Sequence, residues 1–516
     1  MITSHRYPTN KQPLKGLRLV VSGYELEQRE HRGIAVFTKG MLRSLKEAGA
    51  EVWLLSEFTP RMNDMLSRAW LPRAVRRTVF TARLLDQLNS GEARVTSNAL
   101  VTKLRNLPLI RRWLKLVKWI TYGKHLLFPR SRINADQLER VPANELNSSP
   151  YQRCERLEYL RDIDGVICAS DCFNDSFSLA RKRSSQTLLI DLDGFDGFIT
   201  TSPLNLEPLN TPIFLQTVHD LIPLEYSRTG DHLASFSQRL LATTKANRIY
   251  VSEDAEQKFN TALYTSNNKE QKLTHSRVLT QCPSIQFPGD ALDWEARTKT
   301  VQVYSSDQKQ LHNLLPLEFI LFNSAVVPHK NLLFALRAYL ESGIQKLNIQ
   351  FCITGQPQRD AYSREVKELA KQQKNVIFTG YVDDATKRRL YLNALALISP
   401  SLIEGFGIPV LDAACLGMTT IASPIGSHRE IQRMHDFKEK VLLCSTLRTS
   451  DWASAMRLTA LKLQNRSKQL NTESKQLLVN EIRRNRIRRY ETIQREINNE
   501  FRKGLCEILL KNQLSE

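Results

Sequence analysis

The sequence contains no long hydrophobic run. Of its 516 residues, 41% are hydrophobic, which is ample for buried cores, yet no stretch approaches the roughly 18 consecutive apolar residues that a membrane-spanning helix needs. Residues 1–16 are polar, and the apolar segment LRLVVSG behind them is too short for the hydrophobic region of a secretion signal and predicts a first strand instead. We therefore expect a cytoplasmic protein.

Metal-ligand spacing is also missing. The eight cysteines form no pattern typical of a metal site, and several, such as Cys352 and Cys415, lie within apolar runs. Reduced cysteines in a protein core are typical of the cytoplasm. The sequence therefore predicts no metal site.

The chain is longer than a typical single domain, so two domains with extensions are expected. The succession LRLVVSG, FTKGMLRSLKEAG and EVWLLSE predicts the strand–helix–strand start of a doubly wound sheet. A second sheet is expected from Phe319 to about Leu443. The predicted divisions are an N-terminal domain at 1–265, a linker at 266–316, a C-terminal domain at 317–450 and helices at 451–516.

Positive charge is concentrated between residues 60 and 135, where 16 Lys and Arg face 3 acidic residues, in a chain whose net charge is +20. The pattern predicts a basic helical insert, in which helix 109–120 has one basic and one apolar side. Its basic residues are Arg111, Arg112, Lys115 and Lys118, and tryptophans nearby are Trp70, Trp113 and Trp119. Such a helix suits an anionic membrane surface; an insert packed on the sheet explains it equally well. No nucleic-acid recognition motif accompanies the charge.

The segment EGFGIPVLD, from Glu404 to Asp412, is the most informative part of the chain. It follows the apolar run 395–399 and precedes a short apolar segment, so it predicts a strand, a glycine-containing turn and a helix with proline in its first turn. Free backbone N–H groups and the helix dipole make such a turn an anion site. The carboxylates of Glu404 and Asp412 beside it suit hydroxyl groups, which indicates a sugar nucleotide. The alternative is an ordinary strand–turn–helix.

The segment resembles the E-x7-E motif of the retaining glycosyltransferases of family 4, with Asp412 in place of the second glutamate. Other segments resemble this family in the same order: the glycine loop from Gly33, the HDLIP element within 213–226, the strand–loop–helix at 316–341 and the strand and loop at 375–384. The resemblance implies the GT-B fold, with two doubly wound Rossmann-like domains facing a central cleft. It also implies a last helix that crosses back to the N-terminal domain.

The resemblance also implies roles for individual residues. Lys330 would neutralise the leaving diphosphate, Glu404 would bind sugar hydroxyls and Asp412 the ribose, while His219 would face the sugar. A structural role is an equal alternative for His219. The predicted catalytic residues are His219, Lys330 and Glu404, and the predicted donor-binding residues are Gly33, His329, Val382, Gly405, Phe406, Gly407, Ile408, Val410, Leu411 and Asp412. Backbone N–H groups from Ile408 to Leu411, except at Pro409, would hold the phosphates.

Three positions depart from the family pattern. His329 stands where close relatives carry arginine, Ala35 where many have a second glycine, and Asp412 is one methylene shorter than glutamate. Because of these departures, a non-catalytic scaffold protein with the GT-B fold is an alternative interpretation. Within the same fold, a nucleotide-sugar epimerase and a phosphorylase are competing enzyme classes.

The function that the resemblance implies is retaining transfer of a hexose from a GDP- or UDP-linked donor, without metal or cofactor. The acceptor would be a glycan or a lipid-linked molecule in polysaccharide or glycolipid synthesis. Relatives with the HDLIP element include mannosyltransferases, so mannose is the first candidate. A lipid-linked acceptor would place the protein at the inner face of the cell membrane.

Overall fold

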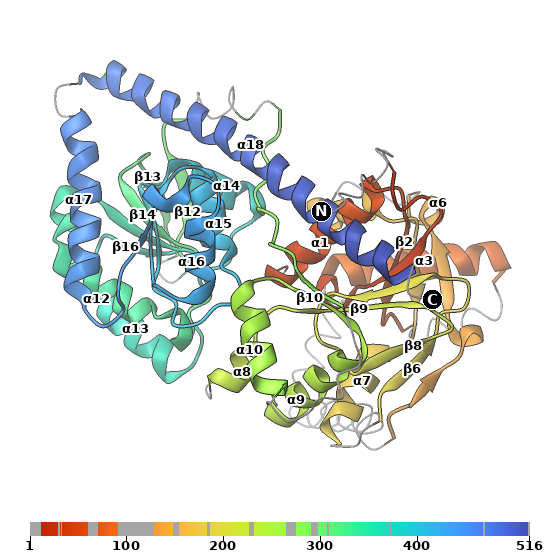
Figure 1. The fold of residues 1–516 in the computed structure, drawn as a ribbon. Helices are drawn as coiled ribbons and strands as arrows, with labels where there is room; N and C mark the ends of the chain where they lie inside the picture. Colours follow the sequence, from red (N-terminus) through yellow and green to blue (C-terminus); the bar gives the residue numbers. More distant parts are fainter. Residues whose placement is uncertain are drawn as a thin grey trace, which may run out of the picture.

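The structure is a computed structural model that contains two α/β domains (Figure 1). It describes residues 12–28, 31, 33–59, 71–90, 128–147, 154–182, 186–226, 232–264, 275–289, 291, 298–306, 309–371, 373–467 and 470–513.

The N-terminal domain is built on an eight-stranded sheet whose order is β11-β10-β9-β7-β1-β2-β5-β4. Only β4 runs antiparallel to its neighbour. The strands are β1 (Arg18–Ser22), β2 (Glu51–Ser56), β4 (Glu139–Pro142), β5 (Gly165–Cys168), β7 (Gly197–Thr200), β9 (Ile213–Val218), β10 (Asn247–Tyr250) and β11 (Ser276–Val278). The main helices are α1 (Gly33–Glu47), α7 (Cys172–Arg181), α9 (Leu233–Ala242) and α10 (Glu253–Leu263). A smaller sheet joins β3 (Arg132–Ile133), β6 (Leu188–Asp191) and β8 (Leu206–Leu209).

The C-terminal domain has a six-stranded parallel sheet in the order β16-β15-β14-β17-β18-β19. Its strands are β14 (Phe319–Phe322), β15 (Gln350–Ile353), β16 (Val376–Phe378), β17 (Ala396–Ser399), β18 (Thr419–Ala422) and β19 (Val441–Leu443). The helices are α12 (Leu332–Ser342), α13 (Ala361–Lys371), α14 (Asp384–Asn393), α15 (Ile408–Cys415), α16 (Gly426–Arg433) and α17 (Thr449–Ser467). When the six strands are numbered in the order in which they occur in the chain, the sheet has the strand order of a doubly wound Rossmann fold. The predicted fold class, two Rossmann-like domains, is confirmed.

Strand order also determines where a ligand can bind. In the C-terminal sheet the order reverses between β14 and β17, and in the N-terminal sheet between β1 and β7. Loops that leave the carboxyl ends of two such strands turn to opposite faces and open a crevice, where ligands of doubly wound sheets bind. The loops after β14 and β17 carry Lys330 and Glu404.

The long helix α18 (Thr472–Gln513) passes along both domains (Figure 1). On the C-terminal domain, the buried Arg486 donates from Nη1 to the carbonyl oxygens of Leu392 and Ala394, each at 2.8 Å. On the N-terminal domain, Phe501 packs edge-on against Phe37 of α1, with ring centroids 5.6 Å apart. The helix therefore packs on both domains and uses buried arginine side chains as well as apolar ones.

The predicted linker and the predicted insert both contain regular secondary structure. Within 266–316, β11 extends the N-terminal sheet, while β12 (Val301–Tyr304) and β13 (Leu311–Leu314) pair as an antiparallel hairpin. Val301 and Leu314 are fully buried there, which explains why this polar segment is ordered.

In the insert, the structure describes α3 (Arg73–Ser90) and residues from 128 onward. The basic face of Arg111, Arg112, Lys115 and Lys118, and the three tryptophans near it, lie outside the described residues. No helix among those described is long and apolar enough to span a bilayer.

Candidate active site

Lys330 and Glu404 meet at the point where the strand order of the C-terminal sheet reverses. Lys330 lies in the 3-10 turn Pro328–Lys330 after β14, and Glu404 lies in the loop after β17. Lys330 Nζ is 2.5 Å from Glu404 Oε2, and the two side chains are 15% and 13% exposed. The Leu402 amide donates to the carbonyl oxygen of His329 at 2.8 Å, which holds the two loops together.

The ion pair keeps the Glu404 carboxylate charged. Burial by itself would raise the pKa of Glu404, but Lys330 and a hydrogen bond from Ser401 Oγ, at 2.7 Å, outweigh burial and lower that pKa. Glu404 is therefore an anion near neutral pH. A carboxylate held in this way can accept hydrogen bonds from hydroxyl groups, whereas it repels phosphate oxygens.

His329 does not replace the missing arginine as a cation. Burial, with a contribution from the neighbouring Lys330, lowers the pKa of His329 to about 4. The imidazole is neutral near pH 7 and packs edge-on against Tyr226 of the N-terminal domain, with ring centroids 5.6 Å apart. The positive charge beside Glu404 is therefore that of Lys330.

The turn before α15 presents unpaired backbone donors. Gly407 is the N-cap of α15 with φ 104°, a left-handed conformation that favours glycine. The amides of Val410 and Leu411 both donate to the carbonyl oxygen of Gly407, at 2.9 and 3.1 Å, so the first turn of the helix uses them. Within the described part of the chain, no acceptor is found for the amides of residues 405–408. The amides without an acceptor are therefore those of residues 405–408, and the predicted contact of Ile408, Val410 and Leu411 with phosphates stays a prediction.

The N-terminal domain closes over this turn. A Cβ atom at Gly405 would lie 2.5 Å from the carbonyl oxygen of His219, so only glycine fits there. Ser252 Oγ donates to the Gly405 carbonyl oxygen at 2.8 Å. A Cβ atom at Gly33 would lie 3.6 Å from Ile408 Cδ1. The structure therefore brings Gly33, His219 and the turn together across the two domains.

Both ring nitrogens of His219 are already engaged. Nε2 lies 2.8 Å from the carbonyl oxygen of Thr201, so it carries the proton, and Nδ1 accepts from Gln281 Nε2 at 3.1 Å. The side chain packs edge-on against Phe37, and burial lowers its pKa to about 4. These contacts describe a neutral, structural histidine. Its role in facing a sugar stays a prediction.

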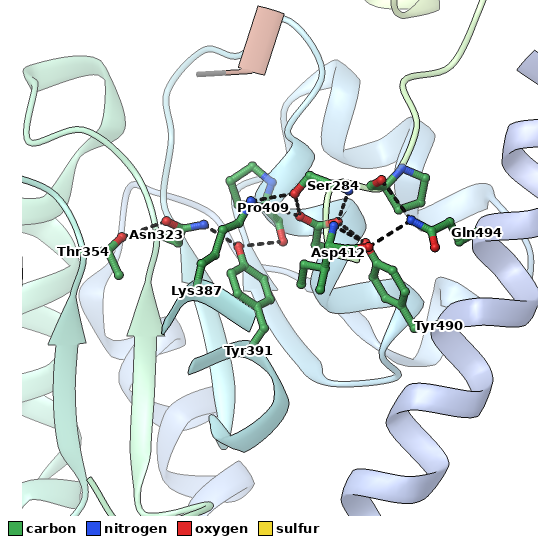
Figure 2. A network of polar contacts seen from close by, with 11 residues as sticks. Ser284, Asn323, Thr354, Lys387, Tyr391, Pro409, Asp412, Tyr490 and Gln494 are labelled. Carbon is green, nitrogen blue, oxygen red and sulfur yellow. Dashed lines mark hydrogen bonds and ion pairs between the residues drawn. The ribbon is translucent and has the colours of Figure 1, made fainter. Parts of the chain in front are cut away.

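Asp412 is the centre of a buried network (Figure 2). Its Oδ1 accepts from the Ser284 amide and from Tyr490 OH, each at 2.7 Å. Its Oδ2 accepts from Ser284 Oγ, and Lys387 Nζ lies 3.9 Å away. Since Ser284 belongs to the linker and Tyr490 to α18, the carboxylate ties α15 to both connections between the domains. A ribose would have to displace Ser284, so the predicted ribose contact stays a prediction.

The same network reaches the ends of the central strands (Figure 2). Tyr391 OH lies 3.5 Å from the Pro409 carbonyl oxygen and accepts from Asn323 Nδ2 at 2.8 Å. Asn323 Oδ1 in turn accepts from Thr354 Oγ1 at 2.7 Å. The first turn of α15 is thus connected to the residues that follow β14 and β15.

His428 was not identified from the sequence, where it is a lone histidine in SPIGSHREI. The structure places it in the first turn of α16, fully buried. A Cβ atom at Gly407 would lie 3.0 Å from its Cδ2 atom. The charges of Glu404 and Lys330 both act on its imidazole. It therefore belongs to the same site.

The remaining predicted residues lie at the margins. Val382 is half-buried in the loop after β16, beside the exposed Tyr381, and its contact with a base stays a prediction. Ala35 is 2% exposed within α1. Phe406 is also buried and packs in the core.

No group of three or more His, Cys, Asp or Glu side chains suitable for a metal occurs among the residues that the structure describes. The chain has two Asp-x-Asp triplets, at 162–164 and 191–193, and both belong to the N-terminal domain. Asp164 accepts from the Val52 amide at 2.8 Å, and Asp191 accepts from Asn210 Nδ2 at 2.9 Å.

Comparisons with known proteins found a family model, curated relatives and solved structures that are similar to this chain. Residues 306–491 match the family model described as Glycosyl transferases group 1. The serotype-specific mannosyltransferase WbdA of Escherichia coli is 26% identical over 245 residues, which are 46% of this chain and only 28% of WbdA. An uncharacterized glycosyltransferase of Methanocaldococcus jannaschii, MJ1607, is 27% identical over 114 residues, 22% of this chain and 29% of that protein. A sucrose-phosphate synthase structure from Thermosynechococcus elongatus covers 97% of this chain and 98% of its own, at 14% identity and a TM-score of 0.46.

A second group of buried carboxylates lies at the carboxyl edge of the N-terminal sheet. Glu27 follows β1, Glu57 follows β2, and the Glu57 amide donates to Glu27 Oε1 at 3.0 Å. Burial raises the pKa of Glu27 to about 7. Burial, together with the charges of Glu27 and Asp171, raises the pKa of Glu57 to about 8. The pair therefore resists full ionisation at neutral pH.

The stability of the protein should fall as the pH rises through this range. The two carboxyl groups have an ordinary value of 4.5, so between about pH 5 and pH 8 the folded state holds protons that the unfolded state has released. The melting temperature of wild type should decline over this interval. Glu27→Gln, which cannot ionise, should flatten the decline, whereas Glu318→Gln, at an exposed position, should follow wild type. A Glu27→Gln profile parallel to that of wild type would contradict the assignment.

Asp412→Asn should lower the melting temperature. The amide retains a single acceptor oxygen, and its NH2 group faces donors, so a buried hydrogen-bond partner is lost at a cost of about 1–3 kcal/mol. Asp436→Asn is the matched control, because Asp436 pairs with Arg489 of the same helix α18 but is 64% exposed, where an ion pair contributes little. Equal melting temperatures for the two variants would show that Asp412 does not hold the domains together.

Proposed function

We propose that this chain is a retaining glycosyltransferase that moves a hexose from a nucleotide-sugar donor without a metal ion. The observation that carries the proposal is the ion pair of Lys330 and Glu404 beside the open amides of residues 405–408, at the reversal point of the C-terminal sheet. The match of residues 306–491 to the group 1 glycosyltransferases supports it.

Each part of this site has a task in such a reaction. The open amides and Lys330 suit the oxygens of a diphosphate, whose charge grows as the sugar departs. Glu404 is held by Lys330 and Ser401, which orients its remaining lone pairs for sugar hydroxyls. In this proposal the acceptor hydroxyl attacks from the face that the phosphate leaves, and the departing phosphate oxygen takes its proton. The glycosidic bond forms as the sugar–phosphate bond breaks.

Mannose is the first candidate for the transferred sugar, because the similar protein WbdA is described as a mannosyltransferase. The donor would be GDP- or UDP-linked, and the acceptor a glycan or a lipid-linked molecule of a surface polysaccharide. Contact with an anionic membrane is supported by the basic segment of the sequence.

A scaffold that binds a nucleotide sugar without turnover is the second candidate. The neutral His329, the occupied carboxylate of Asp412 and the two engaged nitrogens of His219 favour it. A screen of the purified protein against GDP- and UDP-hexoses, by thermal shift and by release of nucleoside diphosphate, separates the two. Binding with release supports the transferase, whereas binding without release in the presence of glycan acceptors supports the scaffold.

Lys330→Gln should reduce transfer by about 100-fold or more, because the cation that neutralises the leaving group is lost. It should also lower the melting temperature, because Glu404 is left as a buried, unpaired charge. The double variant Lys330→Gln/Glu404→Gln should recover the melting temperature but not the transfer. Lys346→Gln, at an exposed lysine of the same domain, is the control. Full transfer by Lys330→Gln would refute the assignment.

Transfer should persist in excess EDTA, since the open amides and Lys330 take the part that a divalent cation plays in metal-dependent transferases. The rate is measured before and after chelation, and again after manganese is added. Loss of turnover on chelation with recovery on manganese would show that the diphosphate is held by a metal.

A further inference from the structure

His428 has one ring nitrogen engaged and the other open. Nδ1 lies 2.9 Å from the carbonyl oxygen of Ser423, and a carbonyl oxygen can only accept, so Nδ1 carries the proton. Nε2 is therefore a bare acceptor in the neutral ring. It is fully buried and has no hydrogen-bond partner among the described residues.

The open nitrogen lies against the candidate donor site. A Cβ atom at Gly407 would lie 3.2 Å from Nε2, so this edge of the ring faces the glycine that caps α15. The hydroxyl of the adjacent Ser427 is also buried without a partner in the described structure. Buried polar groups are normally paired, and one left open costs about 1–3 kcal/mol. Such a group in a binding site indicates a partner supplied by the ligand.

We propose that Nε2 of His428 accepts a hydrogen bond from a hydroxyl group of the transferred hexose, and that His428 thereby helps to determine which hexose is bound. This inference rests on the proposed function and deepens it. The donor must be an O–H group, because a bare nitrogen lone pair repels phosphate oxygens.

The charges around His428 keep the ring in this state. Burial lowers the pKa of His428, and Lys330 adds to this effect, while Glu404 and the hydrogen bond to Ser423 act in the opposite direction. The neutral ring therefore stays an acceptor near pH 7. A hydroxyl group can donate to it and leave the ion pair of Lys330 and Glu404 unchanged.

His428→Asn is the variant that isolates Nε2. The asparagine NH2 group can replace Nδ1–H at the Ser423 carbonyl oxygen, whereas nothing replaces Nε2. Nε2 has no partner in the protein, so the variant loses no hydrogen bond there. The smaller asparagine leaves a cavity at this buried position, so the melting temperature without ligand should fall modestly. His275→Gln, at an exposed histidine of the N-terminal domain, is the matched control.

The test measures binding by calorimetry, so that no acceptor is needed. The ligands are the nucleotide sugar found in the screen, the same donor with each hexose hydroxyl replaced in turn by hydrogen, and the nucleoside diphosphate alone. Wild type should lose about tenfold in affinity for one deoxy donor. His428→Asn should bind the parent donor about tenfold more weakly and show no further loss with that deoxy donor. Both proteins should bind the nucleoside diphosphate equally.

Three outcomes would overturn the inference. If His428→Asn weakens the nucleoside diphosphate as much as the intact donor, the ring contacts phosphate or ribose. If it discriminates among deoxy donors as wild type does, Nε2 does not bind the hexose, and the proposed function stands without this inference. If wild type binds no nucleotide sugar, the proposed function fails and the inference fails with it.

Discussion

The buried carboxylate of Asp412 is the constraint on which the donor side of the molecule depends. A fully buried anion is tolerated only where donors surround it, and these donors come from Ser284 in the linker and Tyr490 in α18. Those two segments connect the domains. Because both donate hydrogen bonds to the same buried carboxylate, α15 is held against the linker and against α18. The turn at 404–407 leads directly into α15, so the hydrogen bonds that hold α15 also fix the position of the open amides in the turn.

The charge of the site follows from burial. Burial lowers the pKa values of His219, His329 and His428, so the three imidazoles are neutral near pH 7. Lys330 is left to supply the positive charge beside the turn, where its ammonium group is paired with Glu404. The pair thus holds a cation ready at the place where a diphosphate would bring negative charge.

Sequence patterns predicted the sheets, since parallel strands buried on both faces give continuous apolar runs. The resemblance assigned Lys330 and Glu404 to one donor site, and the structure brings them together because the carboxyl ends of β14 and β17 share one edge of the sheet. Sequence patterns could not predict the partners of Asp412. Ser284 and Tyr490 lie 128 and 78 residues away in the chain, and isolated polar contacts of this kind leave no periodic signal. His428 was missed for the same reason, because its significance depends on an open nitrogen that only the packing reveals. The short strands β11, β12 and β13 were missed because they lie in a polar segment.

The substitution at Asp412 need not indicate a decayed site. Its shorter side chain leaves room for Ser284, which donates from both its amide and its hydroxyl, so residue and linker fit each other. A glutamate at this fully buried position would overfill it. Among the described residues next to Asp412, unsatisfied groups lie at the adjacent turn, with open amides at 405–408 and a bare nitrogen on His428. A scaffold without a ligand gains no stability from such groups, whereas donors and an acceptor left open at one turn suit a ligand with both phosphate and hydroxyl oxygens.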